Sequence, residues 1–510
     1  MKVFSHSCQG ESHRANNKPC QDASRAEITR DNKMAVCIVS DGHGGERYFR
    51  SQYGSQILVN ITFDKVQEFS DVMSDKRLLY GRPLTQIGTD SKTRFLSNEE
   101  IKIDEQFRQL FRSIKTEWML QICEHAKSIP ASEWEISHIK PQYLNQLKEQ
   151  KDLEQIYGAT LMAYVKTPDF WFAFHLGDGK IIMFDNDGNS SEPVVWDKDC
   201  FLNLTTSICS TDAIDRFRYS YQGDGNFPFA VFLGSDGIDD TFTDGEPLYD
   251  FYRGILQEIN NTDDASVQNY LKSDLPRLSA RGSKDDMSIA YYYDEDSLEK
   301  MVNLITKKQI INREEDFMKL YKEELTLKAS IEEIERDTKG FSEEVQKAED
   351  TSKKIDKEEV YLHNDIESLE AKKKELEMEM DEKLTEIKKS YGLKIIEIEE
   401  SIQNKGAELQ CISKQRAYYN SKDFKSKKYE LINLEYKKKD LVNTERSIDS
   451  TITRMNKLRK LVGEEDLTKD DLIGIYKQNY NNQYTAISSS EADIANDNNE
   501  ETTVSEEDNL

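Results

Sequence analysis

The chain has 510 residues and a formal net charge of −27 at pH 7. So acidic a protein is not expected to bind nucleic acid as its main partner, because phosphate backbones need a basic surface. No apolar run is long enough to cross a bilayer and the first ten residues contain no signal-peptide core, so we expect no membrane association. The seven cysteines show no paired metal-ligand spacing, which predicts free thiols and a cytoplasmic location.

Composition divides the chain into two parts. All nine prolines lie at or before Pro276, and all four tryptophans lie at or before Trp196. The first part has the turn residues and large apolar side chains of a globular domain, which we expect over residues 1–295. The second part is dominated by Glu, Lys, Leu and Ile, a composition typical of long helices.

Strand-like segments alternate with turn residues through the globular part. Their β-branched and aromatic content predicts strands at 2–8, 22–30, 34–40, 159–166, 170–176, 180–184, 229–234 and 287–293. Helices are predicted at 45–60, 98–126 and 264–280, and the second begins with a capping-box pattern from Ser97 to Glu100. Sheets with helices outside them make an α+β fold of two or four layers. The mostly polar stretch 61–156 is expected to be a helical insertion on that frame.

A helical repeat follows from about residue 312 to 465. Apolar residues recur there at spacings of three and four with charged flanks, which predicts a long coiled coil. Its seam includes Leu362, Ile366, Leu369, Leu376, Met380, Leu384, Ile387, Tyr391, Ile395, Ile398 and Ile402. Glycines 340, 392 and 406 leave open whether it is one helix or folds back into a hairpin or bundle. We expect the seam to drive self-association or docking on a partner coiled coil, the alternative being a solvated spacer. Residues 480–510, rich in carboxylates, are expected to be a disordered tail.

Four acidic motifs stand at strand ends or turns of the globular part. They are SDGHGG (40–45), LGDG (176–179), GSDGIDD (234–240) and GSKDD (282–286). Asp41, Asp178 and Asp236 each follow an apolar run and precede a glycine, which lets the backbone approach an ion. Several carboxylates can converge at the edge of a core only if cations neutralise them, and hard divalent ions do so. One Asp-Gly after a strand is usually a turn, but a turn has no need of His43 two residues beyond Asp41.

These residues resemble the metal-dependent serine/threonine phosphatases of type 2C, over about residues 1–294. The most specific pieces are VSDGHGG (39–45), FLGSDGIDD (232–240) and RGSKDDMS (281–288), and GATLMAYV (158–165) is similar to the family's central hairpin. The resemblance implies a β-sandwich flanked by helices in α-β-β-α layers, with a centre for two Mn²⁺ or Mg²⁺ ions at one end. It also implies hydrolysis of phosphoserine or phosphothreonine in a phosphorylated protein by a metal-activated water.

The resemblance also implies a role for each matching residue. Asp41 resembles the carboxylate that bridges the two ions, and Gly42 would offer its carbonyl to one of them. Asp236 and Asp285 resemble the remaining ligands of the first ion. Asp178, with Asp236, resembles part of a weaker third-metal site.

Two further matches concern proton transfer and bound water. His43 resembles the general acid that protonates the departing serine oxygen, which should help by about 10²–10⁴-fold. Nearby carboxylates are expected to favour its charged form. Asp240 matches the second acidic residue of the Ser-Asp-Gly motif, which supports bound water.

The N-terminal motif departs from the family pattern. Where the family usually has Glu-Asp-Ala, this chain has Gln21 before Asp22. Asp22 still matches as a metal ligand, but Gln21 brings no charge, so we expect the second ion to bind more weakly. Arg14 is the candidate for the family's phosphate-binding arginine because a guanidinium binds phosphate in a bidentate manner. Lys18 or His13 could take its place. Residues 186–228 hold no clear copy of the family's Ser-Arg…Gly-Asp segment, so the substrate-facing flap is expected to differ.

Two other interpretations are open. Cys8 and Arg14 fit the C-x₅-R pattern of cysteine phosphatases, which needs a low-pKa thiolate at a helix N-terminus; Pro19 would soon interrupt such a helix. The other is a catalytically weak or inactive phosphatase-like domain that serves as a coiled-coil scaffold. Gln21 supports that interpretation, and the retained aspartates and His43 oppose it.

Overall fold

The computed structural model describes residues 1–30, 32–89, 97–198, 200, 205–242, 245–381 and 385–478. The predicted tail, residues 480–510, lies outside these described residues. Two compact units divide the chain: Met1–Gln309 with Leu461–Glu464, and Ile310–Lys460 with the described residues from Glu465 onward.

The first unit contains two antiparallel sheets. One has the strand order β1-β11-β10-β7-β8 and the other the order β2-β3-β5-β6-β9-β4. Their bounds are β1 Lys2–Cys8, β2 Ala23–Thr29, β3 Met34–Ser40, β4 Thr85–Ile87, β5 Leu161–Lys166, β6 Trp171–Leu176, β7 Lys180–Phe184, β8 Ser190–Ser191, β9 Arg218–Gln222, β10 Ala230–Gly234 and β11 Met287–Tyr293. All eight predicted strands form, with ends within two residues of the prediction. The sequence did not predict the short strands β4, β8 and β9.

Strand β3 shows how the layers are built. Because side chains alternate between the faces of a sheet, Ala35, Cys37 and Val39 enter the core between the two sheets. Val36 and Ile38 point the other way, into a second core under helices. Both faces are covered, so the whole strand is buried and its sequence is apolar throughout.

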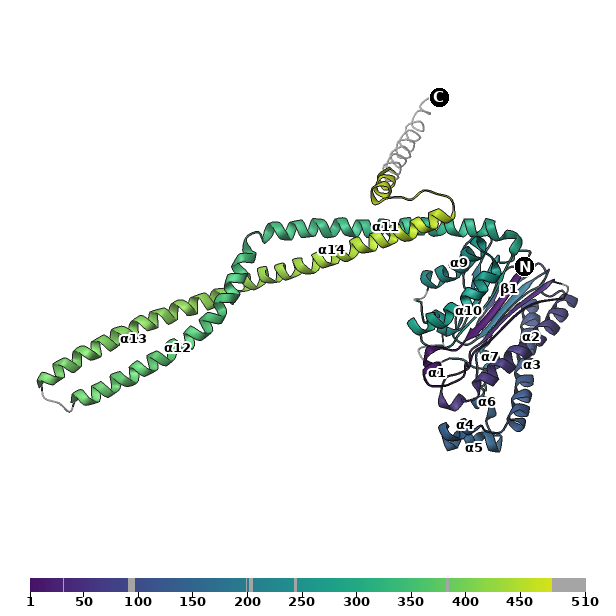
Figure 1. The fold of residues 1–510 in the computed structure, drawn as a ribbon, viewed down its shortest axis with the longest axis horizontal. Helices are drawn as coiled ribbons and strands as arrows, with labels where there is room; N and C mark the ends of the chain where they lie inside the picture. The colour runs from purple at the N-terminus through teal and green to yellow at the C-terminus, as the bar shows by residue number, and fades with distance from the viewer. Residues whose placement is uncertain are drawn as a thin grey trace, which may run out of the picture. The chain divides into compact units, whose positions relative to one another are not determined.

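Helices cover the outer face of each sheet (Figure 1). α2 (Ser51–Asp75) and α3 (Asn98–Ser128) share a core with the six-stranded sheet. α9 (Glu246–Asn261), α10 (Asp264–Arg281) and the start of α11 (Leu298–Asp337) share a core with the other sheet. The order is therefore α-β-β-α, which confirms the fold class that the resemblance implied.

The stretch 61–156 contributes directly to one of these layers. It holds most of α2, strand β4, α3 and the short helices α4 (Glu133–His138), α5 (Pro141–Glu149) and α6 (Leu153–Ile156). The predicted capping box is present, since the Glu100 N–H donates to Ser97 Oγ at 3.2 Å and the Ser97 N–H donates to Glu100 Oε2 at 2.8 Å. Phe107 and Trp118 of α3 are fully buried.

The second unit is built from long helices. They are α11, α12 (Phe341–Asp381), α13 (Thr385–Tyr419) and α14 (Lys422–Leu461). α12 and α13 run antiparallel and side by side (Figure 1), joined by ion pairs such as Lys405 Nζ to Asp365 Oδ2 at 2.6 Å. α14 returns along α11, where Lys438 Nζ lies 2.7 Å from Glu335 Oε1. Of the arrangements left open by the sequence, the chain thus adopts the folded-back hairpin; coiled-coil packing stays a prediction.

Hydropathy adds one observation about the helices. Within the described part of the chain, none combines the length and apolar character needed to cross a bilayer.

Candidate metal centre

Strand register brings three of the predicted aspartates to one edge of the six-stranded sheet. Ala23 at the start of β2 pairs with Ser40 at the end of β3. Asp22 and Asp41 therefore leave neighbouring strands at the same edge. Leu176 at the end of β6 pairs with the first residue of β5, whose start lies beside the end of β3. Asp178 follows that end of β6 and so reaches the same edge.

The five-stranded sheet supplies the remaining candidates. Gly234 at the end of β10 pairs with Ile289 near the start of β11. Asp236 therefore emerges beside Asp285 and Asp286, which precede β11. A hydrogen bond joins the two sheets close by, since Ser7 Oγ of β1 lies 2.8 Å from Ser24 Oγ of β2. Ser7 Oγ also accepts from Ser288 Oγ, in the same sheet, at 2.6 Å.

The aspartates from the two sheets act on one another electrostatically. Desolvation and the charge of Asp236 raise the pKa of Asp41 well above its usual range. Desolvation, Asp286 and Asp236 likewise raise the pKa of Asp22. Desolvation and Asp236 raise the pKa of Asp178 to about 6. So many carboxylates cannot all ionise at neutral pH unless cations neutralise them.

Asp285 and Asp240 lie at the margin of this cluster. Asp285 is exposed, and desolvation and Asp236 raise its pKa. Asp240 is also exposed and follows the short helix α8 (Asp236–Asp239). Its charge contributes to the raised pKa of Asp178.

Asp239 is a site residue that the sequence analysis did not select. Desolvation and the charge of Asp236 raise its pKa to about 9. Its Oδ1 is buried and has no hydrogen-bond partner among the described residues. The available signal was that Asp239, the second acidic residue of GSDGIDD, lies one helical turn from Asp236.

The glycines of the motifs allow backbone to pack on backbone. A Cβ on Gly42 would collide with the carbonyl oxygen of Gln21, and one on Gly237 would collide with that of Asp286. A Cβ on Gly179 would come within 2.6 Å of the Gly234 carbonyl oxygen. The glycines were expected to admit an ion; they also let the loops that carry the aspartates approach one another.

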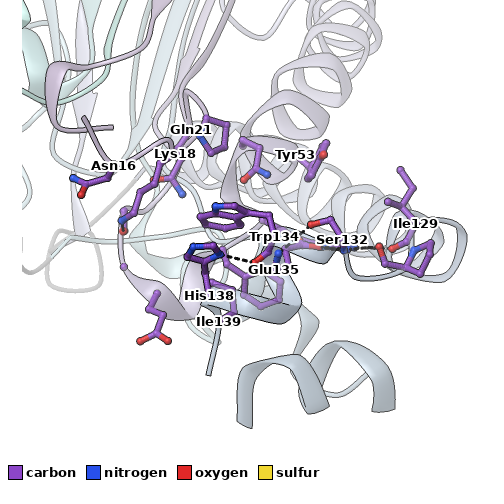
Figure 2. Close-up of a pocket in the computed structure, with 18 residues that line it drawn as sticks. Asn16, Lys18, Gln21, Tyr53, Ile129, Ser132, Trp134, Glu135, His138 and Ile139 are labelled. Atoms are coloured by element: carbon purple, nitrogen blue, oxygen red, sulfur yellow. Dashed lines mark hydrogen bonds and ion pairs between the residues drawn. The ribbon is translucent and has the colours of Figure 1, made fainter. Parts of the chain in front are cut away.

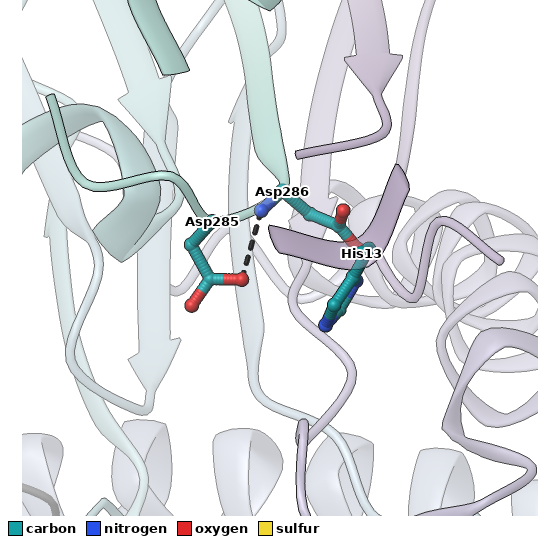
Figure 3. A group of neighbouring side chains, drawn as sticks. All are labelled: His13, Asp285 and Asp286. Carbon is teal, nitrogen blue, oxygen red and sulfur yellow. Dashed lines mark hydrogen bonds and ion pairs between the residues drawn. The ribbon is translucent and has the colours of Figure 1, made fainter. Parts of the chain in front are cut away.

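Asp286 connects three segments of the site, and Figure 3 shows it with His13 and Asp285. Its Oδ1 accepts from the Gly10 N–H at 2.6 Å. Its Oδ2 accepts from the Gln21 N–H at 2.6 Å and lies 2.9 Å from Nδ1 of buried His13. Ligand atoms of His13, Asp285 and Asp286 lie within 4.8 Å of one another, as in a metal site. Because both oxygens of Asp286 are already engaged, we assign it a positioning role.

Gln21 is held between the N-terminal segment and the loop of residues 41–45 that carries His43, called the histidine loop. Its Nε2 donates to Ser51 Oγ at 2.5 Å, and that hydroxyl donates to the His43 carbonyl at 3.0 Å. Its Oε1 is buried and has no hydrogen-bond partner among the described residues. The amide therefore lies at the site, but it brings no negative charge.

His43 differs from expectation in its charge. The ring is half-buried and packs against Tyr48, with centroids 4.7 Å apart. Burial lowers the pKa of His43 to about 4, against the opposing effect of Asp236. Asp236 favours the imidazolium, as expected of a nearby carboxylate, but the loss of hydration outweighs its attraction.

The phosphate-binding candidates occupy different environments. Arg14 belongs to α1 (Glu11–Ala15) and has a side chain 51% exposed, with Nη1 3.4 Å from Glu11 Oε2. Lys18 Nζ donates to the Gly44 carbonyl at 3.5 Å, beside His43. Arg14 thus faces solvent, whereas Lys18 reaches the histidine loop.

Cys8 does not have the properties of a cysteine phosphatase nucleophile. It lies buried in β1, and desolvation raises the pKa of its thiol to about 12. A thiol that stays protonated at neutral pH is a poor nucleophile, so the cysteine interpretation is wrong.

The donor set fits a hard divalent cation. Asp22 Oδ2 is buried and has no hydrogen-bond partner among the described residues. The neighbouring donors are carboxylate oxygens and backbone carbonyls, which Mg²⁺ and Mn²⁺ prefer. The partial exposure of Asp41, Asp178 and Asp236 leaves room for water as further ligands.

An α-β-β-α sandwich with a cluster of carboxylates where its two sheets meet defines the class of protein: a layered β-sandwich with an acidic site at one end. The model of the Protein phosphatase 2C family matches residues 9–275, more than half of the chain. The chain belongs to this family.

Solved structures of similar proteins have low identity to the chain. The Mycobacterium tuberculosis serine/threonine phosphatase PstP/Ppp is 12% identical, with 57% of this chain and 97% of that one covered and a TM-score of 0.33. PppA, a regulatory component of the type VI secretion system in Pseudomonas aeruginosa, is 14% identical, with 57% and 97% covered and a TM-score of 0.31. A C. elegans sex determining protein is 14% identical, with 60% and 67% covered and a TM-score of 0.35. A search of curated proteins finds no match.

Proposed function

We propose that the chain is a metal-dependent protein serine/threonine phosphatase, a phosphoric monoester hydrolase acting on phosphorylated proteins. The observation that carries the proposal is the convergence of aspartates from both sheets, seen in the strand register and in the effect of Asp236 on the pKa values of Asp22 and Asp41. A purely structural role would not place mutually repelling carboxylates together.

The chain's own residues would hold the ions. Asp41, Asp236 and Asp285 are proposed as carboxylate ligands, with Asp22 and the Gly42 carbonyl completing the two principal positions. When bound, Mn²⁺ or Mg²⁺ would acidify water and neutralise charge on the phosphate oxygens.

Two further aspartates complete the proposed ligand environment. Asp178, whose pKa Asp236 helps to raise, is proposed for a weaker third position. Asp240 is proposed to accept hydrogen bonds from bound water.

His43 is proposed to protonate the leaving serine or threonine oxygen. Burial lowers the pKa of His43 to about 4 without bound metal or substrate, so we propose that the imidazole gains its proton as the substrate binds. A phosphate dianion placed beside the ring would raise that pKa, since an opposite charge favours the protonated form.

Lys18 and Arg14 are the proposed contacts to the substrate phosphate, and we favour Lys18. Its ammonium reaches the Gly44 carbonyl next to His43, whereas Arg14 is engaged with Glu11 at the surface. Lys18→Ala should then raise KM for a phosphopeptide more than Arg14→Ala does.

Location and assembly are proposed as well. We propose a cytoplasmic enzyme whose residues 312–465 self-associate or bind a partner coiled coil. On α14, Tyr429, Ile432 and Tyr436 recur at helical spacing and are 71%, 47% and 65% exposed. Light scattering of the full chain should then give a mass above that of one copy; a monomer without a partner would contradict self-association.

The test is phosphatase activity of the purified full chain on p-nitrophenyl phosphate and a phosphoserine peptide. EDTA should abolish turnover and added Mn²⁺ should restore it. Asp41→Asn and Asp236→Asn should each lower kcat/KM by at least about 100-fold, since even outer-shell partners of a metal cost about 10–100-fold. Asp187→Asn, the same change in an exposed turn, is the matched control and should have no effect.

Two outcomes would contradict the proposal. Full activity in EDTA would exclude metal dependence. No turnover with any metal would instead support the inactive scaffold, whose structural support is the neutral Gln21 at the site.

A further inference from the structure

A cleft of about 360 Å³ opens directly beside the candidate metal centre. Gln21 and Gly44 line one side of it, and they are the sequence neighbours of Asp22 and His43. Trp134 and His138 of α4 line the facing side (Figure 2). A polypeptide that brings a phosphoresidue to the metal centre could therefore reach this cleft with a neighbouring residue.

The wall formed by α4 is held in place by a buried ion pair. Arg50, 1% exposed, follows the histidine loop and donates to Glu135 from Nε at 2.7 Å and from Nη2 at 3.0 Å. The same guanidinium donates to the carbonyls of Ile129 and Pro130 at 2.9 and 3.0 Å. A buried ion pair is tolerated when its remaining hydrogen bonds are satisfied. The Arg50–Glu135 ion pair ties the histidine loop to α4 and so fixes the width of the cleft.

A second ion pair connects the same two segments. Lys140 Nζ lies 2.7 Å from Glu46 Oε2, and the Lys140 backbone N–H donates to Glu46 Oε1 at 2.9 Å. Both acidic residues that line the cleft, Glu46 and Glu135, are therefore neutralised by cations. The cleft does not repel an anionic phosphopeptide.

The cleft has apolar side chains in its inner surface, alongside polar ones. Its lining includes Phe49, Tyr53, Ile139 and Trp134, whose ring stacks on His138 with centroids 4.8 Å apart and planes 13° apart. Concave sites with apolar walls and a few polar groups are typical of ligand recognition. A volume of about 360 Å³ suits one large side chain with its backbone and is too small for a folded domain.

We propose that this cleft binds a large apolar or aromatic side chain of the substrate protein, close in sequence to the phosphoresidue. The inference rests on the proposed phosphatase function and names the substrate feature that the enzyme selects. Trp134 supplies the apolar contact, and the Arg50–Glu135 pair positions it.

The experiment is a peptide series assayed with the full-length protein and Mn²⁺. Each peptide carries phosphoserine in an alanine-rich background with one phenylalanine placed at successive flanking positions; p-nitrophenyl phosphate, which has no flanking residues, is the reference. At one or two positions phenylalanine should raise kcat/KM about 10-fold, as expected for burial of one large apolar side chain. Trp134→Ala should reduce that preference to about 2-fold and leave p-nitrophenyl phosphate turnover unchanged.

Ile136→Ala is the matched control, because Ile136 lies on the same helix, is 58% exposed and does not line the cleft. It should keep the full phenylalanine preference. Trp134→Phe should also keep most of the preference, since it retains an aromatic wall.

The outcomes separate the two claims. If the wild-type protein hydrolyses p-nitrophenyl phosphate but shows no preference at any position, the cleft inference is wrong and the phosphatase function stands. That comparison uses only the wild-type protein, so it does not depend on whether a variant folds. If Trp134→Ala lowered kcat/KM equally for the peptide and for p-nitrophenyl phosphate, the cleft inference would also be wrong. Absence of turnover in the wild type contradicts the proposed function itself.

Discussion

Carboxylates such as Asp41 and Asp236, in the unit of residues 1–309, lie close to one another at the ends of buried strands. In residues 310–460 the carboxylates of Asp365 and Glu335 lie along helices, each paired with a lysine of the facing helix. The helical unit places opposite charges together, as expected where charge serves solubility and pairing. The sandwich places like charges together, which makes sense only if a cation completes the arrangement. Both parts of the sequence are rich in charge, so composition alone does not distinguish carboxylates that pair with lysines from carboxylates that cluster.

The two units should differ most in how the replacement of a histidine affects catalysis. His43→Gln should lower kcat/KM for a phosphoserine peptide by about 10²–10⁴-fold, the usual contribution of a general acid. For p-nitrophenyl phosphate the loss should be much smaller, because that leaving group needs no proton. His363→Gln, on an exposed position of α12, is the control and should change neither rate. Equal losses on both substrates would assign His43 to another role.

The two units should also differ in how a lost aromatic ring affects stability. Phe107 is fully buried and stacks on Tyr219 with centroids 4.1 Å apart, so Phe107→Ala should cost about 3–5 kcal/mol. Tyr436, 65% exposed on α14, should change stability by less than about 0.5 kcal/mol when replaced by alanine. Urea unfolding measures both. All four tryptophans belong to the first unit, so their fluorescence reports on that unit alone; an unshifted fluorescence midpoint in Phe107→Ala would contradict the packing.

Metal should stabilise the first unit and leave the helical unit unaffected. At Mn²⁺ concentrations about 100-fold above Kd, binding should add about 2.7 kcal/mol to the stability of the sandwich. Thermal unfolding with EDTA or Mn²⁺, followed by tryptophan fluorescence and by far-UV circular dichroism, separates the units. Asp41→Asn should remove most of the Mn²⁺ effect. An equal shift of both transitions would contradict a metal site confined to the sandwich.

The smallest effect is expected from acid on the helical unit. Burial alone would raise the pKa of Glu324, but hydrogen bonds from Lys328 and Lys469 outweigh it and leave the pKa below its usual value. A carboxyl whose pKa is lowered on folding contributes stability above its unfolded pKa of about 4.3 and loses it as pH falls through the lower folded value. Circular dichroism should therefore show the helical unit weakening below about pH 4. Glu324→Gln should cost about 1 kcal/mol at neutral pH and reduce that acid sensitivity; an unchanged pH profile would contradict the assignment.

Much of the fold follows from local patterns. Apolar runs such as 34–40 and 287–293 predicted strands to within two residues, because burial on both faces leaves a continuous hydrophobic signal. Strand β9 was missed although it has a neighbouring strand on each side. Its sequence, RYSYQ, alternates aromatic rings with Arg218 and Ser220, both fully buried; polar side chains of this kind are buried only because tertiary contacts accommodate them.

By itself the sequence determined the fold class and most of the strands, and it predicted the aspartates of the site, since each of these is marked by residues adjacent in the chain. Only the tertiary structure decided that the long helices fold back, that Asp286 pairs with His13, and that Trp134 and Gln21 line one cleft. It also decided that burial lowers the pKa of His43. Each of these depends on segments far apart in sequence approaching in space, and on the loss of hydration that follows, which no local pattern encodes.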